Sequence, residues 1–145
     1  MRTFASVMAM LLFSFRVYAG EGASQPMPRN VEYDWMSVAS WNEQHGIFVR
    51  RAREGNVDIL FLGDSITDRW AHCAVWQKYY APMRAVNFGM GGDTTQNLLW
   101  RITVGGELEG MSPKAIVLLI GTNNLDMNGE KPDDLPPLVH DRVGG

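Results

Sequence analysis

The chain has 145 residues, a length that fits a single domain. It carries 13 Lys and Arg against 16 Asp and Glu, and its basic residues form no stripe, which excludes a nucleic-acid-binding surface of the usual basic kind. Hydrophobic residues make up 46% of the sequence, an ordinary share for a packed globular protein.

The first 19 residues have the pattern of a secretory signal peptide. Arg2 precedes an apolar stretch from Phe4 to Phe15, and Val17-Tyr18-Ala19 supplies small or apolar residues at a cleavage site. The stretch is short for a membrane span and Arg16 closes it, so a retained membrane anchor is the weaker alternative. We therefore expect a secreted or periplasmic protein. Residues 20–33, rich in Gly, Pro, Ser and Gln, are expected to form a linker.

Helices and strands are expected to alternate after the linker. A helix should run from a capping box at Ser40 and Glu43 to Gly55, because its apolar residues fall on one face. His45 lies on that stripe and is expected to be a packed histidine. Further strands are expected at 57–62, 84–88 and 115–120, with helices at 72–80 and 94–102, the latter capped by Asp93 or Thr94. The apolar stripe of the first of these helices, the one that ends at Gly55, consists of Trp41, His45, Phe48 and Ala52.

This alternation is typical of a parallel sheet joined by right-handed crossovers, which predicts an α/β fold. The pattern stops near the C-terminus. From Asp126 to Pro137 the content of Gly and Pro opposes a regular helix.

A short polar segment follows each of the three expected strands. Because ligands bind beyond the carboxyl ends of strands in parallel sheets, we expect these segments to converge at one edge of the sheet. Ser65 offers a hydroxyl, Gly92 lets the backbone approach a ligand, and Asn123 brings an amide donor. A nucleophile with donors suited to an oxyanion is most of a site for ester hydrolysis. The segments are Gly63-Asp64-Ser65-Ile66, Gly89-Met90-Gly91-Gly92-Asp93 and Gly121-Thr122-Asn123-Asn124.

Each of these residues also has a purely structural interpretation. Ser65 can simply help to cap a helix, Gly92 can serve a turn, and Asn123 can bond its own backbone. Their joint occurrence, each after its own strand, favours catalysis. A phosphate cradle in the second segment is disfavoured, because Thr94 replaces the third glycine of the dinucleotide fingerprint.

The chain resembles the SGNH hydrolase superfamily, also called GDSL esterases. Within it, the resemblance is closest to the catalytic subunits of platelet-activating-factor acetylhydrolase and their bacterial relatives. It rests on the motif segments Leu62–Ser65, Asn87–Gln96 and Gly121–Asn124, together with Leu99–Arg101 and Gly106–Glu109.

The resemblance implies a three-layer, flavodoxin-like parallel sheet flanked by helices. It also implies that Ser65 is the nucleophile, and that its backbone N–H joins Gly92 and Asn123 in an oxyanion hole. No metal or organic cofactor is implied. The implied substrate is a small-molecule or carbohydrate ester, with acetyl esters of carbohydrates or lipids as examples, and no nucleic acid is implied as a partner.

The catalytic base is absent from its usual motif. The family places Asp-x-x-His near the C-terminus, but no Asp in this sequence has a His three residues later. His72 follows Ser65 by seven residues, about 10 Å along a helix, which is too far. His140, next to Asp141, is the alternative base. We therefore expect residues 34–145 to be the N-terminal portion of an SGNH domain, truncated after its third strand.

Two functions remain open on this basis. The chain is either an incomplete exported carboxylic ester hydrolase or a non-catalytic remnant that binds an ester or glycan. The apolar strand at 115–120 would form a bare sheet edge in either case, and such edges promote dimerisation or aggregation.

Overall fold

The structure, a computed structural model, describes residues 22–127. It contains three parallel strands, and β1 (Ile59–Gly63) lies between β2 (Ala85–Gly89) and β3 (Ala115–Leu119). The α/β fold is therefore confirmed, and the order β2-β1-β3 is the order that begins a flavodoxin-like sheet. Gly63, the last residue of β1, pairs with Gly89 on one side and Leu119 on the other, so the three strands end level with one another.

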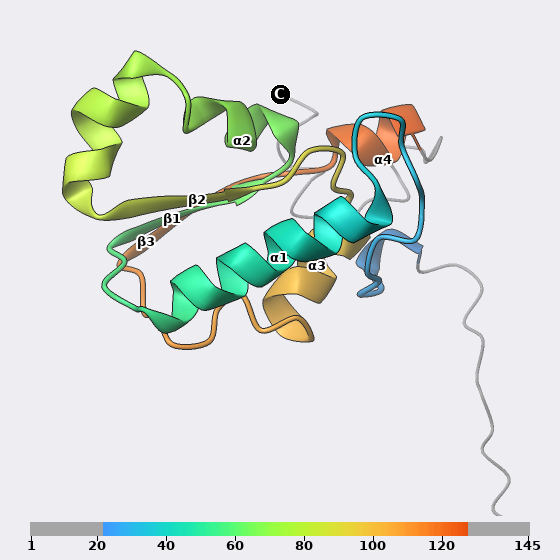
Figure 1. The fold of residues 1–145 in the computed structure, drawn as a ribbon, viewed down its shortest axis with the longest axis horizontal. Coiled ribbons are helices and arrows are strands. Elements are labelled where there is room, and N and C mark those ends of the chain that lie inside the picture. Colours follow the sequence, from blue (N-terminus) through green and yellow to red (C-terminus); the bar gives the residue numbers. More distant parts are fainter. Residues whose placement is uncertain (1–21, 128–145) are drawn as a thin grey trace, which may run out of the picture.

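Helices cover both faces of the sheet (Figure 1). The long helix α1 (Val38–Arg53) and α3 (Thr95–Thr103) lie on one face, while α2 (Ser65–Trp70) and the helical turns after it lie on the other. Those turns are η2 (Trp76–Tyr80, a π-helix) and η3 (Ala81–Met83); the remaining elements are η1 (Gly22–Ser24) and α4 (Thr122–Met127).

The main core lies between the sheet and α1. The expected apolar face of α1 is confirmed, since Trp41, Phe48 and Ala52 are buried in this core. Phe48 stacks on Phe88 of β2 with ring centroids 4.5 Å apart. The opposite face of β1 presents Phe61, whose ring contacts two aromatic rings of η2. Burial on both faces is why the sequence of β1 is almost continuously apolar.

Two helices differ from their predicted boundaries. The capping box predicted at Ser40 is wrong: α1 begins at Val38, and the Ser37 hydroxyl caps it by accepting from the Ser40 backbone N–H at 3.0 Å. The helix predicted at 72–80 is present from residue 74 to residue 80, with residues 76–80 in the π-helix η2. The separate helix α2 precedes it, because Asp64 caps a helix immediately after β1.

The expected linker makes several contacts with the fold where it is described. Met27 exchanges hydrogen bonds with α3, donating its N–H to Gln96 O and accepting from Asn97 Nδ2. The Thr95 hydroxyl donates to Ala23 O at 2.7 Å. These contacts hold residues 22–29 against the start of α3. The signal peptide predicted at residues 1–19 lies outside the described residues, as does His140.

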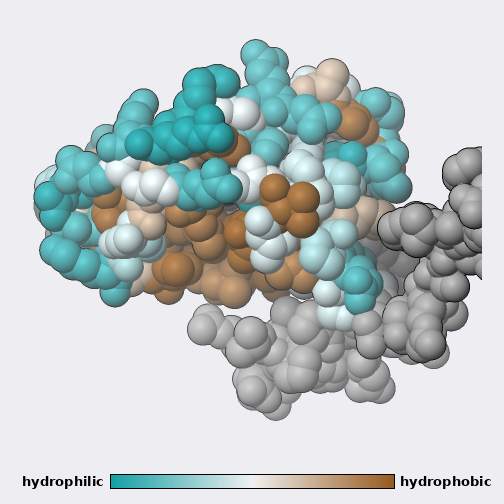
Figure 2. All heavy atoms as spheres, turned by 90° about the horizontal axis from the view of Figure 1, so that it is seen from below, coloured by the Kyte–Doolittle hydropathy of each residue, from teal (hydrophilic) through white to brown (hydrophobic). Residues whose placement is uncertain are grey.

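The strand β3 forms an edge of the described sheet, as expected. All five of its residues are exposed, and they are apolar. Figure 2 shows hydrophobic residues gathered in a band on one face of the molecule. None of the helices within residues 22–127 is both long enough and apolar enough to cross a membrane.

Candidate active site

The three polar segments begin at the same edge of the sheet. Gly63, Gly89 and Leu119 are neighbours across the strand ends, and the segments leave from there. Ser65 becomes the first residue of α2, because the Asp64 carboxylate accepts the Ile66 backbone N–H at 2.9 Å. The predicted convergence of the segments is therefore confirmed.

Contacts with β2 fix the position of α2. Asn87 donates its side-chain amide to Thr67 O at 2.6 Å, and its amide oxygen accepts the Gly89 N–H at 2.8 Å. A Cβ at Gly89 would overlap the Asp68 backbone, so only glycine lets α2 sit this close to the end of β2. The helix that carries Ser65 is thereby held against the strand that leads to Gly92.

The second segment needs glycine at Gly92. Its φ is +71°, a conformation that side chains disfavour, and a Cβ there would lie 2.5 Å from the Trp35 ring. Gly92 is buried, and the carbonyl before it, Gly91 O, accepts a hydrogen bond from Arg29 Nη2 at 2.6 Å.

The third segment is hydrogen-bonded to the second. Asn123, half-buried in α4, donates one amide hydrogen to Asp93 O at 2.8 Å. An Asn amide has two hydrogens, so the second is available for another acceptor. Asn124 is fully buried and bonds both the backbone and the side chain of Thr95, and it also donates to Gln96. These bonds place the amide of Asn123 beside the loop that contains Gly92.

A buried ion network supports the loop from below. Arg101 of α3 is fully buried between Asp93, at 2.8 Å, and Glu107, at 2.7 Å. It also donates to Phe88 O at 3.1 Å, close to the end of β2. The network continues through the indole N–H of Trp41 to Asp93 and through His45 to Glu107. Buried charges survive only when paired in this way.

Burial affects the acids of the site differently. Burial raises the pKa of Asp64, although the Ile66 N–H opposes this shift, and Asp64 Oδ2 has no hydrogen-bond partner among residues 22–127. Burial also pushes the pKa of Asp93 upward, but there the guanidinium of Arg101 leads the groups that favour the charged form. Among the described residues, Asp64 is thus a buried acid that has no ion pair.

Neither of the two described histidines forms a hydrogen bond with Ser65 within residues 22–127. His45 Nδ1 is 2.7 Å from Glu107 Oε1, and its ring lies against Trp41 and Trp100. The expectation of a packed histidine is therefore confirmed. His72 is exposed in the turn after α2, and its backbone N–H donates to Arg69 O.

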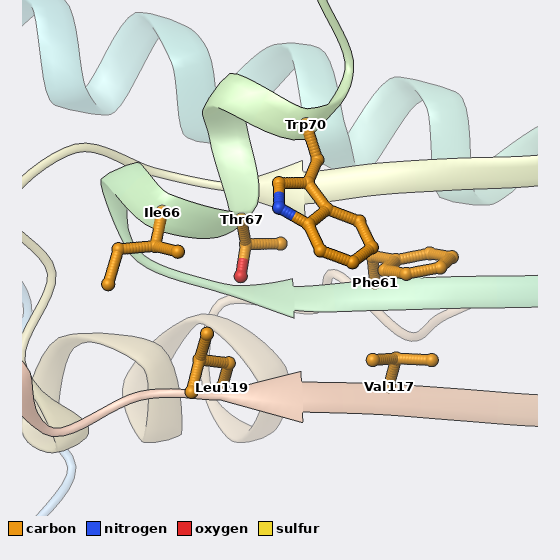
Figure 3. Close-up of a pocket in the computed structure, with 6 residues that line it drawn as sticks. All are labelled: Phe61, Ile66, Thr67, Trp70, Val117 and Leu119. Atoms are coloured by element: carbon orange, nitrogen blue, oxygen red, sulfur yellow. The ribbon is translucent and has the colours of Figure 1, made fainter. Parts of the chain in front are cut away.

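An apolar pocket lies beside the start of α2 (Figure 3). The close-up shows side chains of α2 above the sheet and side chains of β1 and β3 below them. Two lining residues, Ile66 and Thr67, follow Ser65 in the sequence, but Ser65 itself does not line the pocket. Its lining is Phe61, Ile66, Thr67, Trp70, Val117 and Leu119. Nowhere in residues 22–127 do three or more His, Cys, Asp or Glu side chains gather as metal ligands would.

Sequence reasoning assigned no role to the residues that hold the loop in place. Arg101 and Glu107 lie within two of the segments that match the family, and that match was the one indication in the sequence that they matter. Arg29 gave no signal, because it lies in a stretch that looked like a linker. The sequence offers Asp93 or Thr94 as the cap of α3; Thr94 is the cap, and Asp93 is a buried ion partner of Arg101.

Comparison with known proteins identifies related sequences. Residues 61–138 match the GDSL-like Lipase/Acylhydrolase family, which is just over half of the chain. Over 113 residues the chain is 42% identical to platelet-activating factor acetylhydrolase IB subunit alpha2 of Homo sapiens, covering 77% of this chain and 48% of that protein. Subunit alpha1 of Rattus norvegicus is 39% identical over 119 residues, which cover 78% of this chain and 48% of that subunit.

The chain spans about half the length of the curated relatives it matches. A solved structure described as a platelet activating factor from Streptococcus pneumonia is 24% identical, with a TM-score of 0.47 over 64% of this chain and 44% of that one.

Proposed function

The chain belongs to the GDSL-like lipase/acylhydrolase family, and from this premise we propose that it is the nucleophile-bearing portion of an exported carboxylic ester hydrolase. One observation carries the proposal: three segments with a hydroxyl, a buried glycine and an amide leave the sheet at one edge and are bonded to one another. Export rests on the pattern of residues 1–19 alone.

In the proposed reaction, Ser65 Oγ attacks the acyl carbonyl carbon and gives its proton to a base. The carbonyl oxygen becomes an oxyanion, which accepts hydrogen bonds from the backbone N–H of Ser65 and Gly92 and from the Asn123 amide. The alcohol leaves with a proton, and water then hydrolyses the acyl-serine ester. The hydrogen bond from Asn123 to Asp93 O supports its role, because it fixes the amide and leaves one hydrogen free.

If neither His45 nor His72 is the base, a histidine base must lie outside residues 22–127. The sequence has three histidines, and His140 is the third. A serine is a weak nucleophile unless a base takes its proton, so the activity of this chain depends on that group.

The proposed substrate is a small-molecule or carbohydrate ester with a short acyl group such as acetyl. The related subunits are named acetylhydrolases, which supports an acetyl ester without defining the alcohol. The apolar pocket between α2 and the strands β1 and β3 suits a substrate with an apolar part.

The test is hydrolysis of p-nitrophenyl acetate, combined with labelling by a fluorophosphonate and mass-spectrometric mapping of the modified residue. We expect the label on Ser65, and Ser65→Ala should abolish both labelling and turnover. If His140 is the base, His140→Ala should abolish turnover while His72→Ala, its matched control, should not. Labelling that persists in Ser65→Ala would remove the nucleophile assignment.

The alternative function is binding without turnover. The pairing of His45 with Glu107 favours this alternative, because it leaves the described site without a histidine base. Oxyanion donors can still hold an ester that is never attacked. Saturable binding of an acetylated glycan without any release of acetate, in a chain whose Ser65 does not label, would favour this alternative.

The proposal includes association through β3. Its outer edge is unpaired within the described sheet and its apolar side chains are exposed, and uncovered strands of this kind pair with other chains. Light scattering at rising concentration should show dimers or larger species, and a monomer that persists at high concentration would contradict this part of the proposal.

A further inference from the structure

The side chain of Arg29 is buried beside the loop that contains Gly92. Its side chain is 2% exposed, and its Nη2 atom donates to Gly91 O at 2.6 Å and reaches Asp93 Oδ1 at 3.2 Å. Its Nε and Nη1 atoms are buried and have no hydrogen-bond partner within the part of the chain that the structure describes. Burying a guanidinium with so few partners is costly, so the position calls for an explanation.

The carbonyl that Arg29 binds belongs to the same peptide group as the Gly92 N–H. The resonance of a peptide group couples its two ends, so a cation at the oxygen draws electron density from the nitrogen. The N–H then becomes a stronger donor, as in chains of hydrogen bonds that polarise one another. We propose that Arg29 polarises the Gly91–Gly92 peptide and so strengthens the oxyanion donor at Gly92.

This inference rests on the proposed function, since it assumes that the Gly92 N–H meets an oxyanion. Arg29 would act through the peptide and not on the substrate, which makes it a positioning residue.

Two aromatic rings keep water away from this cation. Tyr33 and Trp35 stack in parallel with centroids 5.0 Å apart, and the Arg29 guanidinium lies 5.1 Å from the centroid of the Tyr33 ring. The Trp35 ring also packs against Gly91 and Gly92. In such a dry place a charge acts on its neighbours with far less screening than in water.

Asp93 does not cancel the effect of Arg29. Its carboxylate already accepts from Arg101 at 2.8 Å and from the Trp41 indole at 2.7 Å, so its charge is shared. The distance from Arg29 Nη2 to Gly91 O is 2.6 Å, shorter than the 3.2 Å to Asp93 Oδ1. The peptide oxygen is therefore the nearer acceptor for the cation.

A simpler role for Arg29 would be to anchor residues 22–29 to the fold. That role predicts a loss of stability on substitution but no change in the reactivity of Ser65 in a variant that folds. The amide nitrogen chemical shift of Gly92, which responds to hydrogen bonding at the preceding carbonyl, reports the polarisation itself, and the rate of fluorophosphonate labelling at Ser65 separates the two roles. Ring currents from Trp35 move proton and nitrogen resonances by the same small amount in parts per million, so they do not mimic this response.

The experiment compares nitrogen-15-labelled wild type with Arg29→Met and Arg29→Lys. Arg84→Met is the control, because Arg84 pairs with Asp58 at the opposite end of the sheet. We expect an upfield shift of the Gly92 nitrogen in Arg29→Met, a smaller one in Arg29→Lys, and none in Arg84→Met. An unchanged Gly92 resonance in folded Arg29→Met overturns the proposal.

Wild type alone decides the question if Arg29→Met does not fold. The hydrogen bond should give a scalar coupling between Arg29 Nη2 and the Gly91 carbonyl carbon, and its absence also overturns the proposal. Fluorophosphonate labelling adds a chemical readout: the rate at Ser65 should fall about tenfold in Arg29→Met. If wild-type Ser65 never labels, the proposed function fails, while the amide shift still tests whether Arg29 polarises the Gly91–Gly92 peptide.

Discussion

The two strands that flank β1 have the same apolar character but different surroundings. On the β2 side, every residue from Phe88 to Leu98 is buried, and the loop rests on Arg101 and its partners. On the β3 side, every residue of the strand is exposed. Both strands nevertheless pair with β1 in parallel and end level with it.

The difference shows which half of the proposed site is complete within the described residues. The loop with Gly92 is held by buried charges, by Trp35 and by α3, so its amide should keep one orientation. The third segment depends on its bonds to that same loop, through Asn123 and Asn124. The loop after β2 is therefore held by its own buried contacts, and the segment after β3 is positioned by its hydrogen bonds to that loop and to Thr95.

The largest expected effect comes from breaking the buried network. Arg101→Met leaves Asp93 and Glu107 without their main partner, and losing one member of a buried ion pair costs about 3–5 kcal/mol. The exposed pair of Arg84 with Asp58 should cost only about 0.2–1 kcal/mol when Arg84→Met removes it. Urea denaturation measures both, and equal losses would contradict the claim that the network supports the β2 side.

A smaller effect should distinguish the two strands directly. Leu60 pairs with Val86 on one side and Ile116 on the other, yet Val86 is 9% exposed and Ile116 53%. We expect Val86→Ala to lower the free energy of unfolding by about 2 kcal/mol. Ile116→Ala should cost about 0.5 kcal/mol, because surface changes have small effects.

Urea midpoints at low protein concentration keep association out of this measurement. A cost at Ile116 that matches the cost at Val86 would mean that β3 is covered in solution.

The smallest effect concerns Asp64, at the end of β1 between the two sides. Burial raises its folded pKa above 3.8, so the stability linked to its protonated form is present at low pH and is lost as pH rises through the folded pKa. Asp64→Asn still caps the helix but carries no charge at any pH. Wild type should therefore lose stability relative to the variant as pH rises from about 4 to 7. Urea titrations of both proteins across that pH range measure the difference in their free energies of unfolding. A wild type that becomes more stable than the variant as pH rises would contradict the prediction.

Local patterns in the sequence predicted most of the framework. The three apolar runs gave the strands, and the stripe from Trp41 to Ala52 gave the buried face of α1, because both depend on short-range periodicity. The departure of the three polar segments from one edge of the sheet followed from the rule for parallel sheets. The start of α1 was missed because Ser37 and Ser40 are equally good caps in sequence, and packing decides between them.

The supporting residues could not be predicted from local pattern. Arg29 meets Gly91 across 62 positions of the sequence, and His45 meets Glu107 across the same separation. Charged residues are usually exposed, so a sequence gives no reason to bury Arg101. Only the family resemblance marked the segments that contain Arg101 and Glu107, and it did so without stating a role.

The most direct test of the account is the structure of the protein after a fluorophosphonate has reacted with Ser65. The phosphonyl oxygen of that adduct occupies the place of the oxyanion. We predict that it lies about 2.7–3.1 Å from the Gly92 backbone nitrogen and from Asn123 Nδ2, the distances of donors that stabilise such an oxygen. An adduct on Ser65 whose oxygen points to solvent, away from both donors, would contradict the claim that the three segments form one catalytic site.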